Sequence, residues 1–171
     1  MSTPISAVVI TVSDACARGE RHDESGDKLV ELLNDIGAQI VSREVVSDDL
    51  LSLVELLQKH SENDDVNLIV TTGGTGFGPR DNTPEATKKI VEREAPGLSE
   101  AMRAESLKHT PMGMISRGVC GVRSGCLIVN LPGSPKAVVE SFAVIRPVLP
   151  HVVDLLAGKT RHDLAKFSEL R

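Results

Sequence analysis

One run of residues in this chain has the types and spacing that favour binding of a phosphate group. Four glycines fall within six positions of the segment Gly73-Gly74-Thr75-Gly76-Phe77-Gly78. Glycine lets the backbone approach a ligand closely and turn several N–H groups toward an anion. The segment is neither a G-x-G-x-x-G fingerprint nor a Walker loop with its lysine. On spacing alone, a phosphate site and a tight turn that simply needs glycine are equally good interpretations.

Aspartates follow or flank the segments that could share a sheet edge with this turn. They are Asp14, Asp48, Asp49 and Asp81. Mg²⁺ in proteins takes one or two carboxylates together with phosphate oxygens and water, so acids beside a phosphate-binding turn suit nucleotide chemistry. The alternatives are a turn or helix-capping role for Asp14 and Asp48, and an Asx turn for Asp81. Asp81 is the stronger candidate because it stands between the glycine run and a helix start at Thr83-Pro84.

Two further segments could bind an anionic ligand. Asn130-Leu131-Pro132-Gly133-Ser134 leads from an apolar run into a helix start, and helix N-termini present free N–H groups with partial positive charge. Ser116-Arg117 supplies a hydroxyl and a guanidinium suited to a phosphate or a carbonyl. The alternatives are an ordinary strand-to-helix connection for the first segment and a surface arginine for the second.

The elements that must position these residues alternate along the first half of the chain. Short apolar strands are predicted at 5–12, 38–46 and 66–70, and amphipathic helices around 29–36 and 50–57. This order predicts an α/β fold, a three-layer α/β/α sandwich with a mostly parallel central sheet. In such sheets, ligands bind beyond the carboxyl ends of the strands, so the polar segments after the three strands should share one rim.

The second half of the chain continues with mixed elements. Helices are predicted at 86–93 and 97–107, a hairpin at 119–123 and 126–130, and a last long helical region after Ser134-Pro135. We expect a single domain over residues 1–158, followed by a charged tail at 159–171.

Composition excludes several classes of function. The net charge of −5 offers no basic field for nucleic acid or an anionic membrane, and there is no run long and apolar enough to span a bilayer. The three cysteines lack metal-ligand spacing and are odd in number, which favours a reducing cytoplasm. The five histidines form no recognisable ligand pair or triad and are expected to be exposed or structural.

Three ordered motifs resemble those of the molybdopterin adenylyltransferases, which include the bacterial Mog proteins and the gephyrin G domain. The motifs are Thr11-Val12-Ser13-Asp14, the run from Thr71 through Pro79-Arg80-Asp81 to Thr87, and Asn130-Leu131-Pro132-Gly133-Ser134-Pro135-Lys136. The resemblance covers roughly residues 5 to 157. It implies a homotrimer that binds ATP, Mg²⁺ and molybdopterin, transfers AMP to the terminal phosphate of molybdopterin and releases pyrophosphate. It also implies transient contact with a molybdenum insertase.

The resemblance assigns roles to individual residues. The family's Pro-Asp-Glu motif matches Ser47-Asp48-Asp49 here, with Ser for Pro and Asp for Glu, so Asp48 and Asp81 are the expected catalytic and metal-binding residues and Asp49 is a further metal candidate. Substrate-binding residues are expected at Ser13, Asp14, Gly73, Gly74, Thr75, Gly76, Ser116, Arg117, Asn130, Pro132, Gly133 and Ser134. The alternative function is a catalytically silent molybdopterin-binding or scaffold module of the same fold.

Overall fold

A six-stranded mixed sheet forms the centre of the molecule. In the computed structural model, which describes residues 2–159, its strand order is β2-β1-β3-β6-β5-β4. β1, β2, β3 and β6 run parallel, whereas β4 and β5 are antiparallel to their neighbours. The strands are β1 (Ser6–Val12), β2 (Gln39–Val46), β3 (Leu68–Thr72), β4 (Arg93–Glu94), β5 (Cys120–Arg123) and β6 (Cys126–Leu131). The predicted mostly parallel sheet and the hairpin are confirmed.

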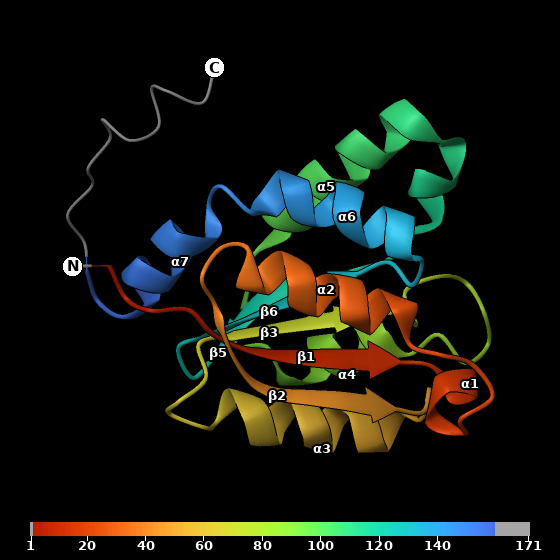
Figure 1. The fold of residues 1–171 in the computed structure, drawn as a ribbon, viewed down its shortest axis with the longest axis horizontal. Coiled ribbons are helices and arrows are strands. Elements are labelled where there is room, and N and C mark those ends of the chain that lie inside the picture. The colour runs from red at the N-terminus through yellow and green to blue at the C-terminus, as the bar shows by residue number, and fades with distance from the viewer. Residues whose placement is uncertain (1, 160–171) are drawn as a thin grey trace.

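Helices cover both faces of the sheet, which gives the predicted three-layer sandwich (Figure 1). One face carries α2 (Glu24–Asn34), α5 (Pro96–His109), α6 (Pro135–Ile145) and α7 (Leu149–Leu156). The other face carries α3 (Leu50–Ser61) and α4 (Thr83–Ile90). The short helix α1 (Asp14–Ala17) lies beyond the carboxyl ends of β1 and β2. A 3₁₀ helix, η1 (Pro111–Ile115), follows α5.

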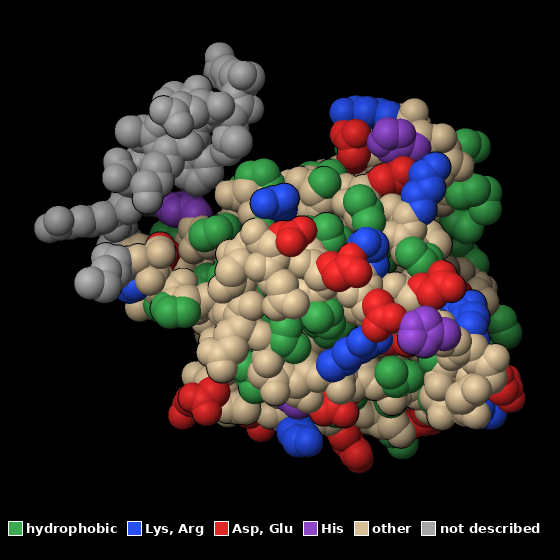
Figure 2. All heavy atoms as spheres, viewed as in Figure 1, with side chains coloured by type: hydrophobic (Ala, Val, Ile, Leu, Met, Phe, Trp, Pro, Cys, Tyr) green, Lys and Arg blue, Asp and Glu red, His purple; other side chains and the backbone are tan. Residues whose placement is uncertain are grey.

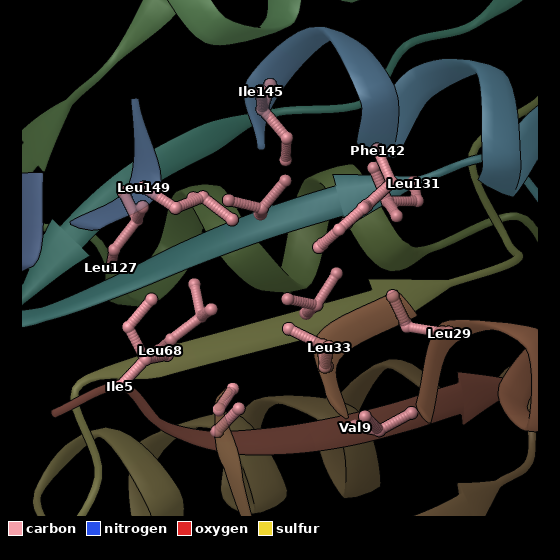
Figure 3. Packing of buried hydrophobic residues seen from close by; sticks show 14 of the residues in the cluster. Ile5, Val9, Leu29, Leu33, Leu68, Leu127, Leu131, Phe142, Ile145 and Leu149 are labelled. Carbon is pink, nitrogen blue, oxygen red and sulfur yellow. The ribbon is translucent and has the colours of Figure 1, made fainter. Parts of the chain in front are cut away.

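The hydrophobic core is divided by the sheet into two clusters. Alternate residues of β1 enter each cluster, with Val9 on the α2 and α6 side and Ile10 on the α3 and α4 side. Both side chains are fully buried, and each such burial contributes roughly 1.5–3 kcal/mol. Figure 3 shows Phe142 of α6 beside Leu131 in the larger cluster. The core therefore fixes the strand ends, and with them the loops that follow.

The edge strand β4 corrects the predicted helix at 86–93. α4 ends at Ile90, because the backbone at Val91 turns extended and the next residues pair with β5. Glu92 N–H donates to the Val122 carbonyl at 2.9 Å. A Cβ on Gly121 would lie 2.6 Å from a methyl carbon of Val91, so glycine permits the close pairing. Tertiary pairing thus overrides the helix propensity of this charged segment.

Other boundaries also differ from the prediction. The helix predicted around 29–36 begins earlier, because α2 starts at Glu24, and the short helix α1 precedes it. The last long helical region is two helices, because the helical conformation is interrupted between Ile145 and Leu149. Within residues 2–159, no helix is long and apolar enough to cross a bilayer. The predicted charged tail, apart from Lys159, lies outside the described residues.

The molecular face seen in Figure 2 carries acidic and basic side chains that are interspersed rather than segregated. This distribution agrees with the modest net charge of −5. It offers no broad basic area on that face for a polyanion.

Candidate active site

A cleft of about 530 Å³ lies at the carboxyl ends of the parallel strands. Segments that follow three different strands contribute to it: Ser13 after β1, Asp48 after β2, and Gly73, Gly74 and Asp81 after β3. The turn after β6 adds Gly133, Ser134 and Pro135, and the segment 21–25 closes the remaining side. The structure therefore brings together the polar segments that the sequence placed on one rim.

The glycine turn begins with two consecutive residues in the left-handed region. Gly73 has φ +97° and Gly74 has φ +64°, conformations that side-chain-bearing residues rarely adopt. A Cβ on Gly73 would lie 2.3 Å from the Val12 carbonyl oxygen. Thr83 holds the turn from the other side, since its Oγ1 donates to the Gly73 carbonyl at 2.8 Å and its N–H to the Gly74 carbonyl at 3.1 Å. The turn thus needs glycine for its backbone and also lines the cleft.

The turn after β6 packs directly on the glycine turn. A Cβ on Gly133 would lie 3.3 Å from the Gly73 Cα. Thr72 Oγ1 donates to the Pro132 carbonyl at 2.7 Å, and Ser25 Oγ donates to the Gly133 carbonyl at 2.6 Å. The Ser134 hydroxyl caps α6 by accepting the Ala137 N–H at 3.2 Å. The segments after β3 and β6 and the first turn of α2 are consequently fastened to one another around the cleft.

Asp14 and Asp48 bind each other's backbone reciprocally. Asp48 Oδ2 accepts the Asp14 N–H at 2.8 Å, and Asp14 Oδ1 accepts the Asp48 N–H at 3.0 Å. Arg80 donates to both oxygens of Asp14, at 2.6 and 2.9 Å. These hydrogen bonds hold the pKa of Asp14 at about 2, with the Arg80 contact the largest cause. Asp14 is thereby neutralised by Arg80 and lies beside the cleft rather than among its lining residues.

Asp48 faces the cleft with a carboxylate that is costly to ionise. Burial raises its pKa above the ordinary value, and the negative charges of Asp14 and Asp81 add to that effect. Asp81 accepts the Gly78 N–H at 2.8 Å through Oδ2, and this oxygen would lie 2.9 Å from a Cβ on Gly76. Both carboxylates therefore line the same cleft, and that of Asp81 also binds the glycine segment.

Replacement of Asp48 by Asn should stabilise the fold in the absence of divalent cations. The pKa of this carboxyl is higher in the folded state than in the unfolded state, so its ionisation above that pKa opposes folding. At lower pH the carboxyl is protonated in both states, and this destabilisation disappears. We expect a higher Tm for Asp48→Asn than for the unmodified protein at pH 7.5 in EDTA, with the gap closing toward pH 4. Thermal unfolding at both pH values checks this. An equal or lower Tm at pH 7.5 would contradict it.

The donor set at the cleft fits a cation shared with a phosphate-bearing ligand. Among the described residues, no group of three or more His, Cys, Asp or Glu side chains could hold a metal by themselves. Asp48 and Asp81 are two carboxylates facing one cavity, which matches the one or two that Mg²⁺ takes when phosphate and water supply its other ligands. Asp49 is placed differently: its Oδ1 caps α3 by accepting Ser52 N–H at 2.8 Å, outside the cleft lining.

Ser116 and Arg117 lie at a second cavity of about 400 Å³. The Arg117 guanidinium donates to the carbonyls of Gly76 at 2.6 Å and Asp81 at 2.8 Å, and it pairs with Glu85. These contacts tie Arg117 to the glycine segment, so its donors support the loop that carries Asp81. Ser116 is not among the residues that line the main cleft.

Asn130 and Thr75 are buried beneath the rim. The Asn130 amide donates to Thr71 Oγ1 at 3.1 Å and to Thr87 Oγ1 at 3.0 Å, and its carbonyl oxygen accepts the Val119 N–H at 3.1 Å. Asn130 thus joins β3, α4 and the segment before β5.

The segment 21–25 was not singled out from the sequence, yet it forms one wall of the cleft. Its centre is the buried Asp23, whose Oδ2 accepts Thr11 Oγ1 at 2.7 Å and Arg43 at 2.9 Å. Asp23 Oδ1 caps α2 by accepting the Gly26 N–H at 2.9 Å. The signal that could have revealed this wall is an Asp three residues before a Gly at the start of a helical pattern.

Removal of the Arg43 partner should destabilise this wall. Arg43→Ala leaves the buried Asp23 carboxylate without its cation, and we expect a loss of about 2 kcal/mol in the free energy of unfolding. Arg18→Ala is the control, because Arg18 and its partner Glu20 are both exposed to water, which screens the pair, so its removal should change the free energy of unfolding very little. Urea unfolding measures both variants, and equal losses for the two would refute the expectation.

Comparison with known families agrees with this geometry. The family described as "Probable molybdopterin binding domain" matches residues 8–151, which is most of the chain and includes every strand-end segment of the cleft. The chain belongs to this family. The expected family resemblance is thereby confirmed.

Relatives of established name cover most of this chain. A molybdopterin adenylyltransferase from Helicobacter pylori is 39% identical over 152 residues, which cover 88% of this chain and 86% of that protein. The molybdenum cofactor synthesis protein cinnamon from Drosophila melanogaster is 43% identical over 150 residues, which cover 86% of this chain and 25% of that protein. This member of the molybdopterin-binding family thus spans a quarter of the longer relative.

Solved structures share the fold closely. The molybdopterin biosynthesis enzyme MoaB from Thermus thermophilus superposes with a TM-score of 0.85 and 44% identity, covering 91% of this chain and 98% of that one. The molybdopterin biosynthesis Mog protein from Mycobacterium ulcerans superposes with a TM-score of 0.84 and 40% sequence identity. The match covers 92% of this chain and 99% of that one. Relatives named MoaB and relatives named Mog therefore share the three-layer fold of this chain.

Proposed function

We propose that this chain is a molybdopterin adenylyltransferase. Its family membership and relatives of that name, which it matches over most of their length, support the assignment. The observation that carries the proposal is the placement of Asp48 and Asp81 against one glycine-lined cleft at the carboxyl ends of the strands. Such a cleft suits a reaction in which phosphate groups are positioned and their charge is offset.

In the proposed reaction, a terminal phosphate oxygen of molybdopterin attacks the α-phosphorus of ATP. A new P–O bond forms, the bond between the α-phosphorus and the bridging oxygen to the β-phosphate breaks, and pyrophosphate leaves with that electron pair. The nucleophile is already anionic, so no strong base is needed. This requirement agrees with a cleft that is built from carboxylates and backbone N–H groups.

The cleft residues would divide the work between orientation and charge. Gly73 and Gly74, at the start of the turn, would bring backbone close to the phosphates of ATP, and the N-terminus of α6 behind Gly133 and Ser134 would favour a second anionic group. Ser13, at the base of α1, would complete the floor. Asp48 and Asp81 would hold Mg²⁺, which when bound offsets the negative charge of the reacting phosphates.

The assignment of the pterin side rests on fewer contacts. Gly133 and Ser134 line the main cleft, whereas Ser116 lines the second cavity with Arg117. Ser116 also lines a small cavity with Asn130 and Pro132, and Pro132 directly precedes Gly133 of the main cleft. We keep Ser116, Arg117, Asn130, Pro132 and the carboxylate Asp14 as proposed contributors, the buried Asn130 acting through the rim that it supports.

The alternative is a binding module of the same fold that holds molybdopterin without transferring AMP. Purified protein with ATP, Mg²⁺ and molybdopterin should form adenylylated molybdopterin and pyrophosphate, detected by chromatography and mass spectrometry. Tight pterin binding with no AMP transfer would replace the enzyme assignment with the binding module. Omission of Mg²⁺ tests the proposed metal, since turnover should then fall to background.

Assembly and location follow the same proposal. We propose that the chain forms a homotrimer, contacts a molybdenum insertase transiently and acts in the cytoplasm. Sedimentation of the purified protein tests the trimer, for which a single species of three times the chain mass of 18.3 kDa is expected.

A further inference from the structure

The lining of the main cleft is short of cations for a site that would take two phosphate-rich substrates. Its acidic side chains are Asp23, Glu24, Asp48 and Asp81. Within residues 2–159, the lysine and arginine side chains of the lining consist of Arg21 alone. A phosphate held in low dielectric normally meets a guanidinium or ammonium group as well as backbone N–H donors.

The other arginines around the site are committed to carboxylates of the protein. Arg43 pairs with Asp23 at 2.9 Å, and Arg80 pairs with Asp14 at 2.6 Å. Arg117 is paired with Glu85 and is also bound to two carbonyls of the glycine segment. These three guanidinium groups therefore stabilise the loops at the rim of the cleft.

Arg21 is different, because no hydrogen bond or ion pair reaches its guanidinium from the part of the chain that the structure describes. The side chain belongs to an exposed residue at the wall of the cleft. All its donors are therefore available to a ligand, at no cost of breaking an internal ion pair.

The backbone that follows Arg21 is anchored. His22 contacts Asp27 of α2 at 2.6 Å. Two residues further on, Asp23 is buried in its contacts with Thr11 and Arg43. These contacts fix the backbone beside Arg21 at the wall of the cleft.

We propose that Arg21 is a substrate-binding residue that contacts a phosphate group in the cleft. The inference rests on the proposed function, since it assumes phosphate-bearing substrates. Two sources supply that chemistry, the triphosphate of ATP and the terminal phosphate of molybdopterin. Arg21 lines the same cleft as Asp48 and Asp81, which would share Mg²⁺ with these phosphates, so its guanidinium would add positive charge to that cleft.

Equilibrium binding of ATP, inorganic pyrophosphate and molybdopterin, each measured separately, tests the proposal. Arg21→Ala should weaken binding of at least one phosphate ligand about tenfold or more, as loss of a hydrogen bond to a charged group does, and Arg21→Lys should restore part of it. Weakened ATP and pyrophosphate binding assigns the contact to the nucleotide, whereas weakened molybdopterin binding alone assigns it to the pterin phosphate. Arg18→Ala is the matched control, with an arginine three residues away that does not line the cleft.

Unchanged binding of all three ligands by Arg21→Ala, relative to Arg18→Ala, would overturn the inference. Because Arg21 makes no ion pair with the described residues, the Tm of Arg21→Ala should equal that of the unmodified protein. A loss of binding can therefore be told apart from unfolding. The proposed function fails in a different way. If the unmodified protein binds a phosphate ligand through Arg21 yet forms no adenylylated molybdopterin, the contact stands and the transferase assignment falls.

Discussion

Asp81→Asn should lower kcat for AMP transfer by about a hundredfold or more while the protein still binds molybdopterin. The substitution removes a negative charge from the cleft, and electrostatic groups of this kind in active sites contribute effects of that size. The fold should survive, because an amide oxygen can still accept the Gly78 N–H that Asp81 accepts at 2.8 Å. Steady-state formation of adenylylated molybdopterin, with pterin binding measured in parallel, gives the answer.

Two companion variants sharpen this result. Asp35→Asn, at the exposed C-terminal end of α2, removes the same charge away from the cleft and should leave kcat unchanged. Asp49→Asn decides whether the capping role of Asp49 is its whole role, since Asn caps helices as well as Asp does. If turnover is retained, Asp49 acts only as a helix cap. If kcat falls as much as in Asp81→Asn, Asp49 also binds the metal. Full activity of Asp81→Asn would remove Asp81 from the mechanism.

Gly73→Ala should destabilise the protein by about 3 kcal/mol or more. An L-residue in the left-handed region costs roughly 1–2 kcal/mol, and here the added Cβ would also stand 2.3 Å from the Val12 carbonyl oxygen. Because that oxygen belongs to the backbone of a buried strand, it cannot retreat without disturbing the sheet. Urea unfolding measures the loss, and AMP transfer at low temperature reports whether the remaining folded protein has lost its cleft.

Gly37→Ala separates the cost of positive φ from the cost of the clash with the Val12 carbonyl oxygen. Gly37 also has positive φ, at +74°, but a Cβ there would meet nothing within 4 Å. We expect this variant to lose only the conformational cost, about 1 kcal/mol, and to keep its AMP transfer. If both variants lose the same free energy of unfolding, the close approach of Gly73 to β1 carries no energetic weight.

The rim was predictable because parallel strands end at the same edge of a sheet. Apolar runs located β1 and β3 to within two residues, and the polar residues after each strand, such as Asp48 and Gly73, had to meet there. The helix starts at Thr83 and Pro135 were equally legible, since proline in the first turn marks them. Local patterns thus predicted the mostly parallel sheet and the shared rim, whereas the order of the strands came from the structure.

What the sequence did not reveal depends on partners far apart in the chain. Arg117 looks like a ligand-binding arginine, but its donors are used by Gly76, Asp81 and Glu85 on segments 32–41 residues away. Asp23 looks like an ordinary polar-loop residue, but Arg43 on β2 and Thr11 on β1 bury it. Side-chain pairing of this kind has no periodic signature, so only the folded geometry assigns it.

The contact between Gly73 and Gly133 limits how this cleft can be remodelled. These residues terminate different strands, yet their main chains meet with no side chain between them. A bulkier residue at Gly133 would push on Gly73, and one at Gly73 would push on the Val12 backbone, so these walls cannot be varied independently by evolution or design. Adaptation to a differently shaped substrate would fall instead on the exposed side chains of Arg21, His22 and Glu24, which line the cleft and can be exchanged without moving a neighbouring turn.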